Sequence, residues 1–339
     1  KGGILLKILI TGVAGFLGSH LADRMINLGH SVIGVDNLVG GELKNVNESV
    51  DFHLCDCLSL SDMVNICNDC DVVFHAACTA HDGLSLFSPS YITNNTFQNT
   101  ISVLSAAAQN NVKKFIYCSS MSRYGLQQSV PFTEDMVCNP QVPYGVAKYA
   151  SELVVKQICE LNNMDYCIVV PHNIIGPRQC YTDPFRNVAA IMINRMLKKQ
   201  QPIIYGDGSQ KRCFSYISDV VFCLERAILQ NNVNGEVINI GPDEEFITIN
   251  ELANEIASIM NFTVNPIYYP QRPNEVKYAT CSSEKARKLL GYSTKTTLHD
   301  GLVNMVNYMY NEGPKNFNYN YEIEINNKNT PLTWSKRKI

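Results

Sequence analysis

Runs of β-branched residues alternate with helical patterns through the first half of the chain, and this alternation limits the fold more than any other feature. Strands joined in this way by helices pair in parallel, and the helices cover both faces of the sheet. The run Lys114–Ser119 is almost continuously apolar or aromatic, as expected of a strand buried on both faces. The remaining predicted strands are Leu5–Thr11, Ser31–Val35, Val50–His53, Asp71–His75 and Tyr166–Pro171, and the predicted helices are Leu17–Leu28, Ser61–Asn68, Tyr91–Asn110 and Tyr144–Leu161.

The second half of the chain has a looser pattern, and 339 residues exceed what one compact core usually holds. We therefore predict an α/β fold in which a doubly wound parallel sheet is joined to a smaller C-terminal α/β lobe. The helices predicted here are 184–199, Ser218–Gln230 and Asn250–Met260, with a strand at Val237–Ile240. The predicted division is a sheet domain of residues 1–175 to which 216–245 return, a substrate lobe of 176–215 and 246–315, and a C-terminal arm of 316–339.

Composition and charge exclude several classes of protein. With 28 basic against 31 acidic residues, the net charge of -3 gives no electrostatic basis for binding nucleic acid. The longest apolar runs are too short to span a bilayer, and Lys1-Gly2-Gly3 shows no signal-peptide pattern. Most of the 13 cysteines lie inside apolar segments, which predicts reduced core thiols in a cytoplasmic protein and no metal site.

A glycine-rich turn follows the first predicted strand. In Thr11-Gly12-Val13-Ala14-Gly15-Phe16-Leu17-Gly18, three glycines at intervals of three keep the turn tight and open the next helix. A diphosphate can then approach the backbone and lie on the amides at the helix N-terminus. Such glycines can also serve helix packing alone, but here Asp36 ends the second strand, where an acid hydrogen-bonds a ribose diol. The context predicts a Rossmann-type dinucleotide site.

The carboxylate of Asp36 also selects the cofactor. It would repel a 2′-phosphate, and no arginine follows within the next several residues, so NAD is favoured over NADP. Asp56, after the third strand, is expected near the adenine, although it could instead cap the next helix. Small residues after His75 would allow the backbone to approach the cofactor closely. The residues assigned to the cofactor are Gly12, Gly15, Phe16, Leu17, Gly18, Asp36, Asn37, Asp56, Cys57, Ala76, Ala77, Tyr144, Lys148 and Pro171.

Tyr144 and Lys148 are the predicted catalytic pair, because four residues apart they share one helix face. Such a pair is common on protein surfaces, but this one follows the glycine-rich turn and Ser119-Ser120 at a strand end. Lys148 and the positive nicotinamide ring are expected to lower the pKa of Tyr144 from about 10 towards neutrality. Tyr144 would then be a general base, with Ser120 bonded to the reacting hydroxyl.

These motifs together resemble the extended short-chain dehydrogenases/reductases, the NAD-dependent sugar-nucleotide epimerases and dehydratases. The likeness covers nearly the whole chain and is greatest to proteins of the UDP-glucose 4-epimerase type. It includes the segments 119–125 (SSMSRYG), 131–135 (PFTED) and 183–188 (DPFRNV). Two departures stand out: Asn99 occupies a position where the family usually has glycine, and Val170 replaces a common arginine.

The resemblance implies a nucleotide-sugar substrate, most simply a UDP-sugar. Asn173 would contact it, and Arg212 and Arg272 would pair with its diphosphate, as arginine does bidentately. Either arginine could instead form a surface ion pair. The residues assigned to the substrate are Ser120, Asn173, Asn187, Arg212, Arg272, Glu275 and Ala279.

The resemblance also distinguishes between reactions. Dehydratases of the family carry an Asp-Glu pair after the strand-end serine or threonine, and here Met121 and Ser122 stand in its place. We therefore expect 4-epimerisation, in which Tyr144 takes the proton of the 4-hydroxyl, a transient 4-keto sugar turns, and the cofactor stays bound. The alternatives are a 4,6-dehydratase of the same family, or a decarboxylase, which needs a site for the C6 carboxylate that the sequence does not identify. Another is a keto-sugar reductase, and from another class a catalytically silent NAD-binding sensor.

Ala279 bears on the choice of sugar. By the resemblance, a position after the Arg-Pro-x-Glu motif limits the space at the sugar C2, and Ala279 aligns there. A small residue would admit an N-acetyl group, so UDP-GlcNAc and UDP-GalNAc are expected to be accepted beside UDP-glucose and UDP-galactose. Tyr278 is one residue away, and its placement at that site would reverse the expectation.

The resemblance further implies a homodimer through the helices near 91–110 and 144–161, although both could serve the core instead.

Overall fold

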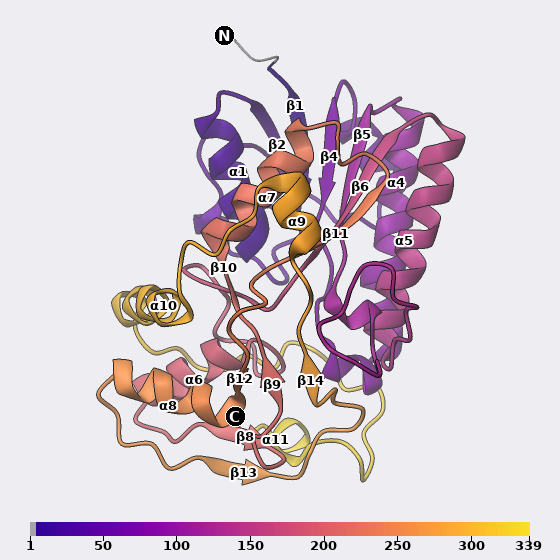
Figure 1. Cartoon of the computed structure of the whole chain (residues 1–339). Coiled ribbons are helices and arrows are strands. Elements are labelled where there is room, and N and C mark those ends of the chain that lie inside the picture. The colour runs from indigo at the N-terminus through magenta and orange to yellow at the C-terminus, as the bar shows by residue number, and fades with distance from the viewer. Residues whose placement is uncertain (1–4) are drawn as a thin grey trace.

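A seven-stranded parallel sheet forms the centre of the molecule in the computed structural model, which describes residues 5–339 (Figure 1). The predicted features of Lys1-Gly2-Gly3 lie outside the described residues. The strand order is β11-β6-β5-β4-β1-β2-β3, and every neighbouring pair is parallel. The strands are β1 (Lys7–Thr11), β2 (Ser31–Asp36), β3 (Asp51–Leu54), β4 (Val72–His75), β5 (Lys114–Cys118), β6 (Asp165–Pro171) and β11 (Glu236–Ile240).

The sheet reverses its winding between β1 and β4, as a doubly wound sheet does, and the predicted α/β fold class is confirmed. Every residue of β4 and β5 is buried, which agrees with their apolar sequences. Because the strands are parallel, their carboxyl ends lie at one edge. The loops that leave β1 and β4 diverge there, and ligands bind in such crevices.

Helices cover both faces of this sheet (Figure 1). One face packs against α1 and α7 in a cluster that includes Leu21 and Leu224, and the other against α2, α4 and α5 in a cluster that includes Met63 and Val155. The bounds of these helices are α1 (Phe16–Asn27), α2 (Leu60–Ile66), α4 (Asn99–Gln109), α5 (Pro143–Leu161) and α7 (Ile217–Leu229).

A third hydrophobic cluster lies beyond the carboxyl edge of the sheet. It joins α6 (Val188–Leu197), α8 (Ile249–Ile259) and α10 (Leu298–Glu312). Short strand pairs complete this region: β7 (Ile174–Ile175) with β10 (Ser215–Tyr216), β8 (Ile203–Tyr205) with β13 (Ile267–Tyr269), and β9 (Lys211–Arg212) between β12 (Ile247–Thr248) and β14 (Tyr278–Ala279).

One helix inside the range predicted for the smaller lobe packs on the sheet instead. This helix, α9 (Glu284–Leu290), contributes Ala286 and Leu290 to the cluster that contains α1 and α7. The segment 246–315 therefore does not lie wholly in one lobe. No helix among residues 5–339 is long and apolar enough to cross a lipid bilayer.

The single helix predicted at Tyr91–Asn110 is wrong in detail. The chain forms α3 (Pro89–Thr93), then a π-helical turn at Asn94–Gln98, and only then α4. Side-chain amides bond carbonyls four residues earlier along this stretch, as in the Asn95 Nδ2 bond to Tyr91 O (3.0 Å). These bonds compete for helix carbonyls, which accounts for the widened turn.

The helix predicted at 184–199 begins later than expected. Asn187 has a φ of 67°, a left-handed conformation that a helix cannot contain, and α6 starts at Val188. The residues before it form a loop that includes Phe185 and Arg186. The sequence pattern from residue 184 predicted a helix. The tertiary contacts of this loop override that local preference.

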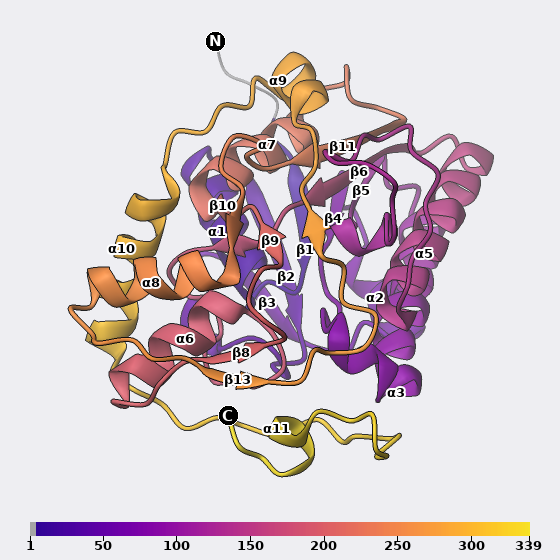
Figure 2. The same ribbon diagram turned by 60° about the horizontal axis from the view of Figure 1, so that its bottom comes forward.

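The C-terminal arm, 316–339, runs back along the outside of the molecule to the start of α3 (Figure 2). The carboxylate of Glu324 accepts hydrogen bonds from the backbone amides of Ser90 and Tyr91 (2.9 and 2.7 Å) at the first turn of α3. Trp334 in α11 (Leu332–Ser335) is only 2% exposed. The arm thus packs with Leu84, Phe87, Phe185 and Trp334 in a separate cluster.

We predict that Trp334→Ala releases this arm. Removing a buried tryptophan costs about 3–5 kcal/mol, so amide hydrogen exchange of residues 316–339 should accelerate by about 100-fold or more. Leu332→Ala is the matched control, because Leu332 lies on the same helix and is 57% exposed. Equal exchange in the two variants, measured by mass spectrometry, would show that Trp334 does not anchor the arm.

Candidate active site

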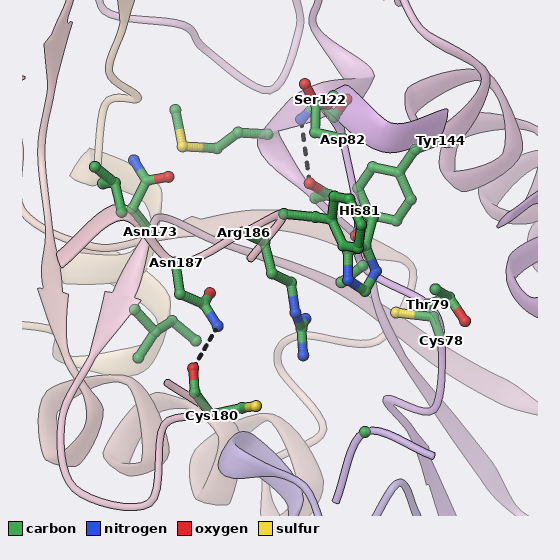
Figure 3. Close-up of a pocket in the computed structure, with 18 of the residues that line it drawn as sticks. Cys78, Thr79, His81, Asp82, Ser122, Tyr144, Asn173, Cys180, Arg186 and Asn187 are labelled. Carbon is green, nitrogen blue, oxygen red and sulfur yellow. Dashed lines mark hydrogen bonds between the residues drawn. The ribbon is translucent and has the colours of Figure 1, made fainter. Parts of the chain in front are cut away.

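A cavity of about 600 Å³ lies at the carboxyl edge of the sheet, between the sheet and the smaller lobe. Of the residues assigned to a site from the sequence, Asp56 alone is outside its lining. Figure 3 shows part of the cavity, with Tyr144 and Asn173 on different walls. The predicted residues in the lining are Gly12, Gly15, Phe16, Leu17, Gly18, Asp36, Asn37, Cys57, Ala76, Ala77, Ser120, Tyr144, Lys148, Pro171, Asn173, Asn187, Arg212, Arg272, Glu275 and Ala279.

The glycine-rich turn packs too closely for side chains at two positions. Gly12 has a φ of 74°, and a Cβ atom there would lie 3.1 Å from the Ala77 backbone. A Cβ on Gly18 would collide with the carbonyl of Gly12. The turn and the small residues after β4 therefore form one backbone surface, and α1 begins on it without a side-chain cap. Its free amides fit a dinucleotide diphosphate.

Asp36 is fixed by two backbone amides at the end of β2. Its Oδ2 accepts from Ala14 N (3.0 Å) and its Oδ1 from Leu38 N (2.8 Å). Burial raises the pKa of Asp36, while these amides act in the opposite direction. Asp36 lines the cavity, and each of its oxygens can accept a further hydrogen bond, as a ribose diol requires. The chain therefore fits NAD at this position.

Asp56 lies outside the cavity and is exposed. Its carboxylate accepts from Leu58 N (2.9 Å) and from Asn37 Nδ2 (3.2 Å). The first bond forms a local turn before α2, whose N-cap is Ser59 without a side-chain cap bond, so Asp56 does not cap that helix. Contact between Asp56 and an adenine stays a prediction.

Helix α5 presents one polar stripe to the end of β5. Tyr144, Lys148 and Glu152 follow at intervals of four, and all three are buried. Lys148 Nζ donates to Cys118 O (2.7 Å) and lies 5.9 Å from the centre of the Tyr144 ring. This contact fixes the ammonium beside the phenol, as the spacing predicted.

In the protein without a cofactor, the pKa of Tyr144 is raised, and not lowered as predicted for the complex. Burial is the largest influence and raises the pKa above its ordinary value. Lys148 and a hydrogen bond with Ser120 act to lower it, in the predicted direction. The positive nicotinamide ring, the second influence named from the sequence, belongs to the complex with the cofactor.

A buried ion pair supports the loop that carries Ser120. Arg123 Nε lies 2.8 Å from Glu152 Oε1, and both side chains are almost fully buried. Ser119 Oγ donates to the same carboxylate. Ser120 Oγ in turn accepts from Ser122 N (3.2 Å). Glu152 was not identified from the sequence, although its spacing of four from Lys148 was a signal for it.

The predicted diphosphate-binding arginines are partly engaged by the protein. Arg272 Nη2 bonds Glu275 Oε1 (2.6 Å). Arg212 Nη2 donates to Val276 O (2.7 Å) and lies 3.7 Å from Glu275. Arg272 Nε is buried without a hydrogen-bond partner among residues 5–339. The two guanidinium groups thus line one wall together, and their role towards a diphosphate stays a prediction.

The other predicted substrate residues lie on different segments of the lining. Asn173 Nδ2 bonds Cys213 O (2.9 Å), and Asn187 Nδ2 bonds Cys180 O (3.2 Å; Figure 3). In β14, Ala279 lines the cavity, whereas Tyr278 is 44% exposed and its ring lies 6.3 Å from that of Phe246. The strand alternation therefore turns the small residue, and not the large one, towards the cavity.

Several cavity residues were not identified from the sequence. His81 Nε2 lies 2.6 Å from Asp183 Oδ2, and Arg186 Nε lies 3.3 Å from the same oxygen. Tyr321 of the C-terminal arm packs against His81, with ring centres 4.6 Å apart. Asp82 accepts a hydrogen bond from Ser122. These residues follow no recognised spacing, because loops and the arm bring them together only in the fold.

His75, at the end of β4, has a structural role. Its ring nitrogens lie 2.8 Å from Thr11 Oγ1 and 3.1 Å from Thr100 Oγ1. Burial lowers the pKa of His75 to about 3, and Lys148 adds to this effect. Residues 5–339 contain no group of three or more His, Cys, Asp or Glu side chains placed to hold a metal ion.

Comparison with known proteins agrees with this geometry. The sequence model of the NAD dependent epimerase/dehydratase family matches residues 8–241. A putative UDP-glucose 4-epimerase of Methanocaldococcus jannaschii is 34% identical over 309 residues, which are 90% of this chain and 98% of the relative. The chain belongs to the NAD dependent epimerase/dehydratase family. The predicted family and its cofactor, NAD, are confirmed.

Two solved structures are similar along almost their whole length. The UDP-glucose 4-epimerase of Thermotoga maritima with UDP-glucose has a TM-score of 0.86 at 32% identity, and covers 91% of this chain and 99% of its own. The UDP-glucuronic acid 4-epimerase of Bacillus cereus, in complex with UDP-glucuronic acid and NAD, has a TM-score of 0.84 at 30% identity, with coverage of 91% and 100%. The similar proteins thus differ in the sugar that they bind.

His75 makes the stability of the fold depend on pH. The unfolded chain takes up a proton at this histidine below about pH 6.5, whereas the folded protein does so only near pH 3. The contribution of His75 to the free energy of unfolding is therefore fully present above about pH 6.5. It is lost as the pH drops towards 3, by at most about 1.4 kcal/mol per pH unit. Denaturant unfolding between pH 7.5 and 4.5 should show a shallower fall for His75→Gln. His53→Gln, on the edge strand β3, is the control, and equal slopes in all three proteins would contradict this account.

Proposed function

We propose that the protein is an NAD-dependent 4-epimerase that interconverts UDP-glucose and UDP-galactose through a transient 4-keto sugar. The observation that carries this proposal is the position of Tyr144, Lys148 and Ser120 in the same cavity as the glycine-rich turn and Asp36. A general base, a hydroxyl that bonds the substrate and a dinucleotide site are together the parts that the reaction needs.

Each of these side chains has a defined task. Bound NAD supplies a hydride acceptor and donor beside C4 of the sugar. Tyr144 takes the proton of the 4-hydroxyl and later returns it, while Ser120 holds that hydroxyl in place. The ammonium of Lys148 favours the phenolate form of Tyr144. The 4-keto sugar turns in the cavity between the two proton transfers, so no net oxidation results.

The two parts of the molecule divide the ligands in this proposal. The sheet domain holds NAD at the glycine-rich turn and Asp36, and the smaller lobe holds the nucleotide sugar. Arg212 and Arg272 pair with the sugar-nucleotide diphosphate, with Asn173, Asn187 and Glu275 at the nucleotide and sugar. All of them line one cavity, which supports this assignment.

The residues after Ser120 disfavour dehydration. Met121 lines the cavity next to it, and a thioether cannot transfer protons. Elimination of water across C5 and C6 needs both an acid and a base beside those atoms. The Asp-Glu pair of the dehydratases is replaced here by Met121 and Ser122, which favours the epimerase over that alternative.

Ala279 supports a broader choice of sugar. It lines the cavity, whereas Tyr278 lies outside the lining. We infer that the space at Ala279 admits an N-acetyl group on C2, so that UDP-GlcNAc and UDP-GalNAc are also interconverted.

The protein is further proposed to act as a homodimer in the cytoplasm. The outer side of α5 carries Val146 and Leu153, which are 52% and 43% exposed, and a second copy would cover them. All 13 cysteines are free thiols, which is typical of a reducing compartment.

The proposed activity is tested by proton NMR of the anomeric region, with UDP-glucose and no added reductant. Galacto-configured signals should appear, and a 4-keto-6-deoxy product or no change would contradict the proposal.

Tyr144→Phe should reduce kcat by at least about 100-fold, because it removes the general base. Tyr149→Phe is the control: Tyr149 lies on the same helix outside the cavity lining, and its loss of a hydroxyl should leave the rate unchanged.

The role of Ala279 is tested by Ala279→Tyr. A bulky ring in the cavity should exclude the acetamido group, so turnover of UDP-GlcNAc should fall at least about tenfold more than that of UDP-glucose. The matched control, Tyr278→Ala, removes a ring that lies outside the cavity lining and should not change the ratio. An equal fall for both sugars in Ala279→Tyr would show that this residue does not set the choice.

A further inference from the structure

One carboxylate in the cavity has no part in the epimerase mechanism. Asp82 lies in the loop after β4, lines the cavity and is exposed to it. The Ser122 hydroxyl donates a hydrogen bond to its Oδ1, and Figure 3 shows the two residues together above Tyr144. Its second oxygen has no hydrogen-bond partner among residues 5–339 and is not a buried, unsatisfied atom. That oxygen is therefore available to a ligand.

No cation in residues 5–339 forms an ion pair with Asp82, although Arg272 and Arg212 are near enough to favour its ionised form. Asp82 is open to the cavity, but the surrounding protein desolvates its carboxylate and raises the pKa of Asp82, and the hydrogen bond from Ser122 opposes that shift. Arg272 is bonded to Glu275, and in the proposed function both arginines pair with the diphosphate. Asp82 then remains an unbalanced negative charge in the cavity.

The position of Asp82 indicates that its carboxylate lies close to the sugar. Ser122, its hydrogen-bond donor, is two residues from Ser120, whose Oγ accepts from Ser122 N. Ser120 marks the place of the sugar 4-hydroxyl in the proposed function. The ring atoms beside C4 are C3, which carries a hydroxyl, and C5, which carries C6. The substituent that meets Asp82 therefore comes from one of these two positions.

We propose that Asp82 selects the sugar: it accepts a hydrogen bond from a hexose hydroxyl next to the reacting centre, and its charge excludes sugars that carry a carboxylate at C6. This proposal rests on the proposed function and specifies its substrate class as neutral hexoses. A carboxylate only accepts hydrogen bonds, so it suits a hydroxyl donor. Two carboxylates at one site repel each other, which disfavours binding of the second.

Arg186, a further cation in the cavity lining, does not offset that repulsion. Arg186 Nε lies 3.3 Å from Asp183 Oδ2, and Asp183 also accepts from His81. Burial lowers the pKa of His81, which favours its neutral form. The group of three is therefore neutral as a whole, and Arg186 is not a free partner for a sugar carboxylate.

The test compares UDP-glucose with UDP-glucuronic acid, the sugar nucleotide in the similar Bacillus cereus structure. Both kcat/KM and the dissociation constant, from calorimetry, are measured for wild type and Asp82→Asn. Wild type should prefer UDP-glucose, and Asp82→Asn should raise the ratio of uronate to glucose by at least about tenfold in both quantities. Asp82→Ala, which also removes the charge, should shift the ratio in the same direction if the amide variant folds poorly.

Two further variants separate charge from structure. Asp51→Asn removes a carboxylate from the exposed strand β3, where the side chain is 72% exposed, and should keep the wild-type ratio. Ser122→Ala removes the hydrogen bond but keeps the charge, so the uronate should stay disfavoured.

An unchanged ratio in Asp82→Asn, or a wild-type preference for UDP-glucuronic acid, would overturn the proposal, as would failure of both ligands to bind. A 4-keto-6-deoxy product that depends on Asp82 would also overturn it, because Asp82 would then act as an acid or base. If wild type binds the sugars without turnover, the proposed function fails, and the ratio of the dissociation constants still decides the role of Asp82.

Discussion

The parallel pairing of β1, β4, β5 and β6 is the constraint on which the site depends. These four strands lie side by side, and their carboxyl ends share one edge. The glycine-rich turn, the loop of Asp82, the serines of 119–122 and Asn173 each follow one of them. Sequence separations of more than 150 residues are thereby reduced to the width of a cavity.

The catalytic chemistry at this edge of the sheet needs charged side chains that are buried, and each buried charge needs a hydrogen-bond or ion-pair partner. Lys148 is bonded to the carbonyl of Cys118, and Glu152 is bonded to Arg123 and Ser119. An unpaired charge at such a depth would cost several kcal/mol. The stripe of α5 therefore fixes the loop of Ser120 and the phenol of Tyr144 in one rigid arrangement. In the proposed function, substrate choice depends instead on Asp82 in the loop after β4 and on Ala279 in β14.

Local patterns predicted the sheet, the glycine-rich turn, Asp36 and the shared face of Tyr144 and Lys148, because each depends on a short spacing along one element. The sequence did not indicate Asp82, and it marked Arg186 only as part of the segment 183–188 without a role, since their neighbours come from distant loops. The helix predicted at 91–110 failed because amide side chains bond its carbonyls, which a hydrophobic pattern does not report. The sequence did not indicate that burial, a tertiary property, is the largest influence on the pKa of Tyr144 in the chain alone; the predicted lowering in the complex with NAD stays a prediction.

The central claim is that one hydride leaves C4 of the sugar and returns to the same carbon. It is tested most directly with UDP-glucose that carries deuterium at C4, incubated with the purified protein and no added reductant. The account predicts UDP-galactose with the deuterium retained at C4, seen by NMR and mass spectrometry. Deuterium in the solvent or at C6, or epimerised product without the label, would contradict it.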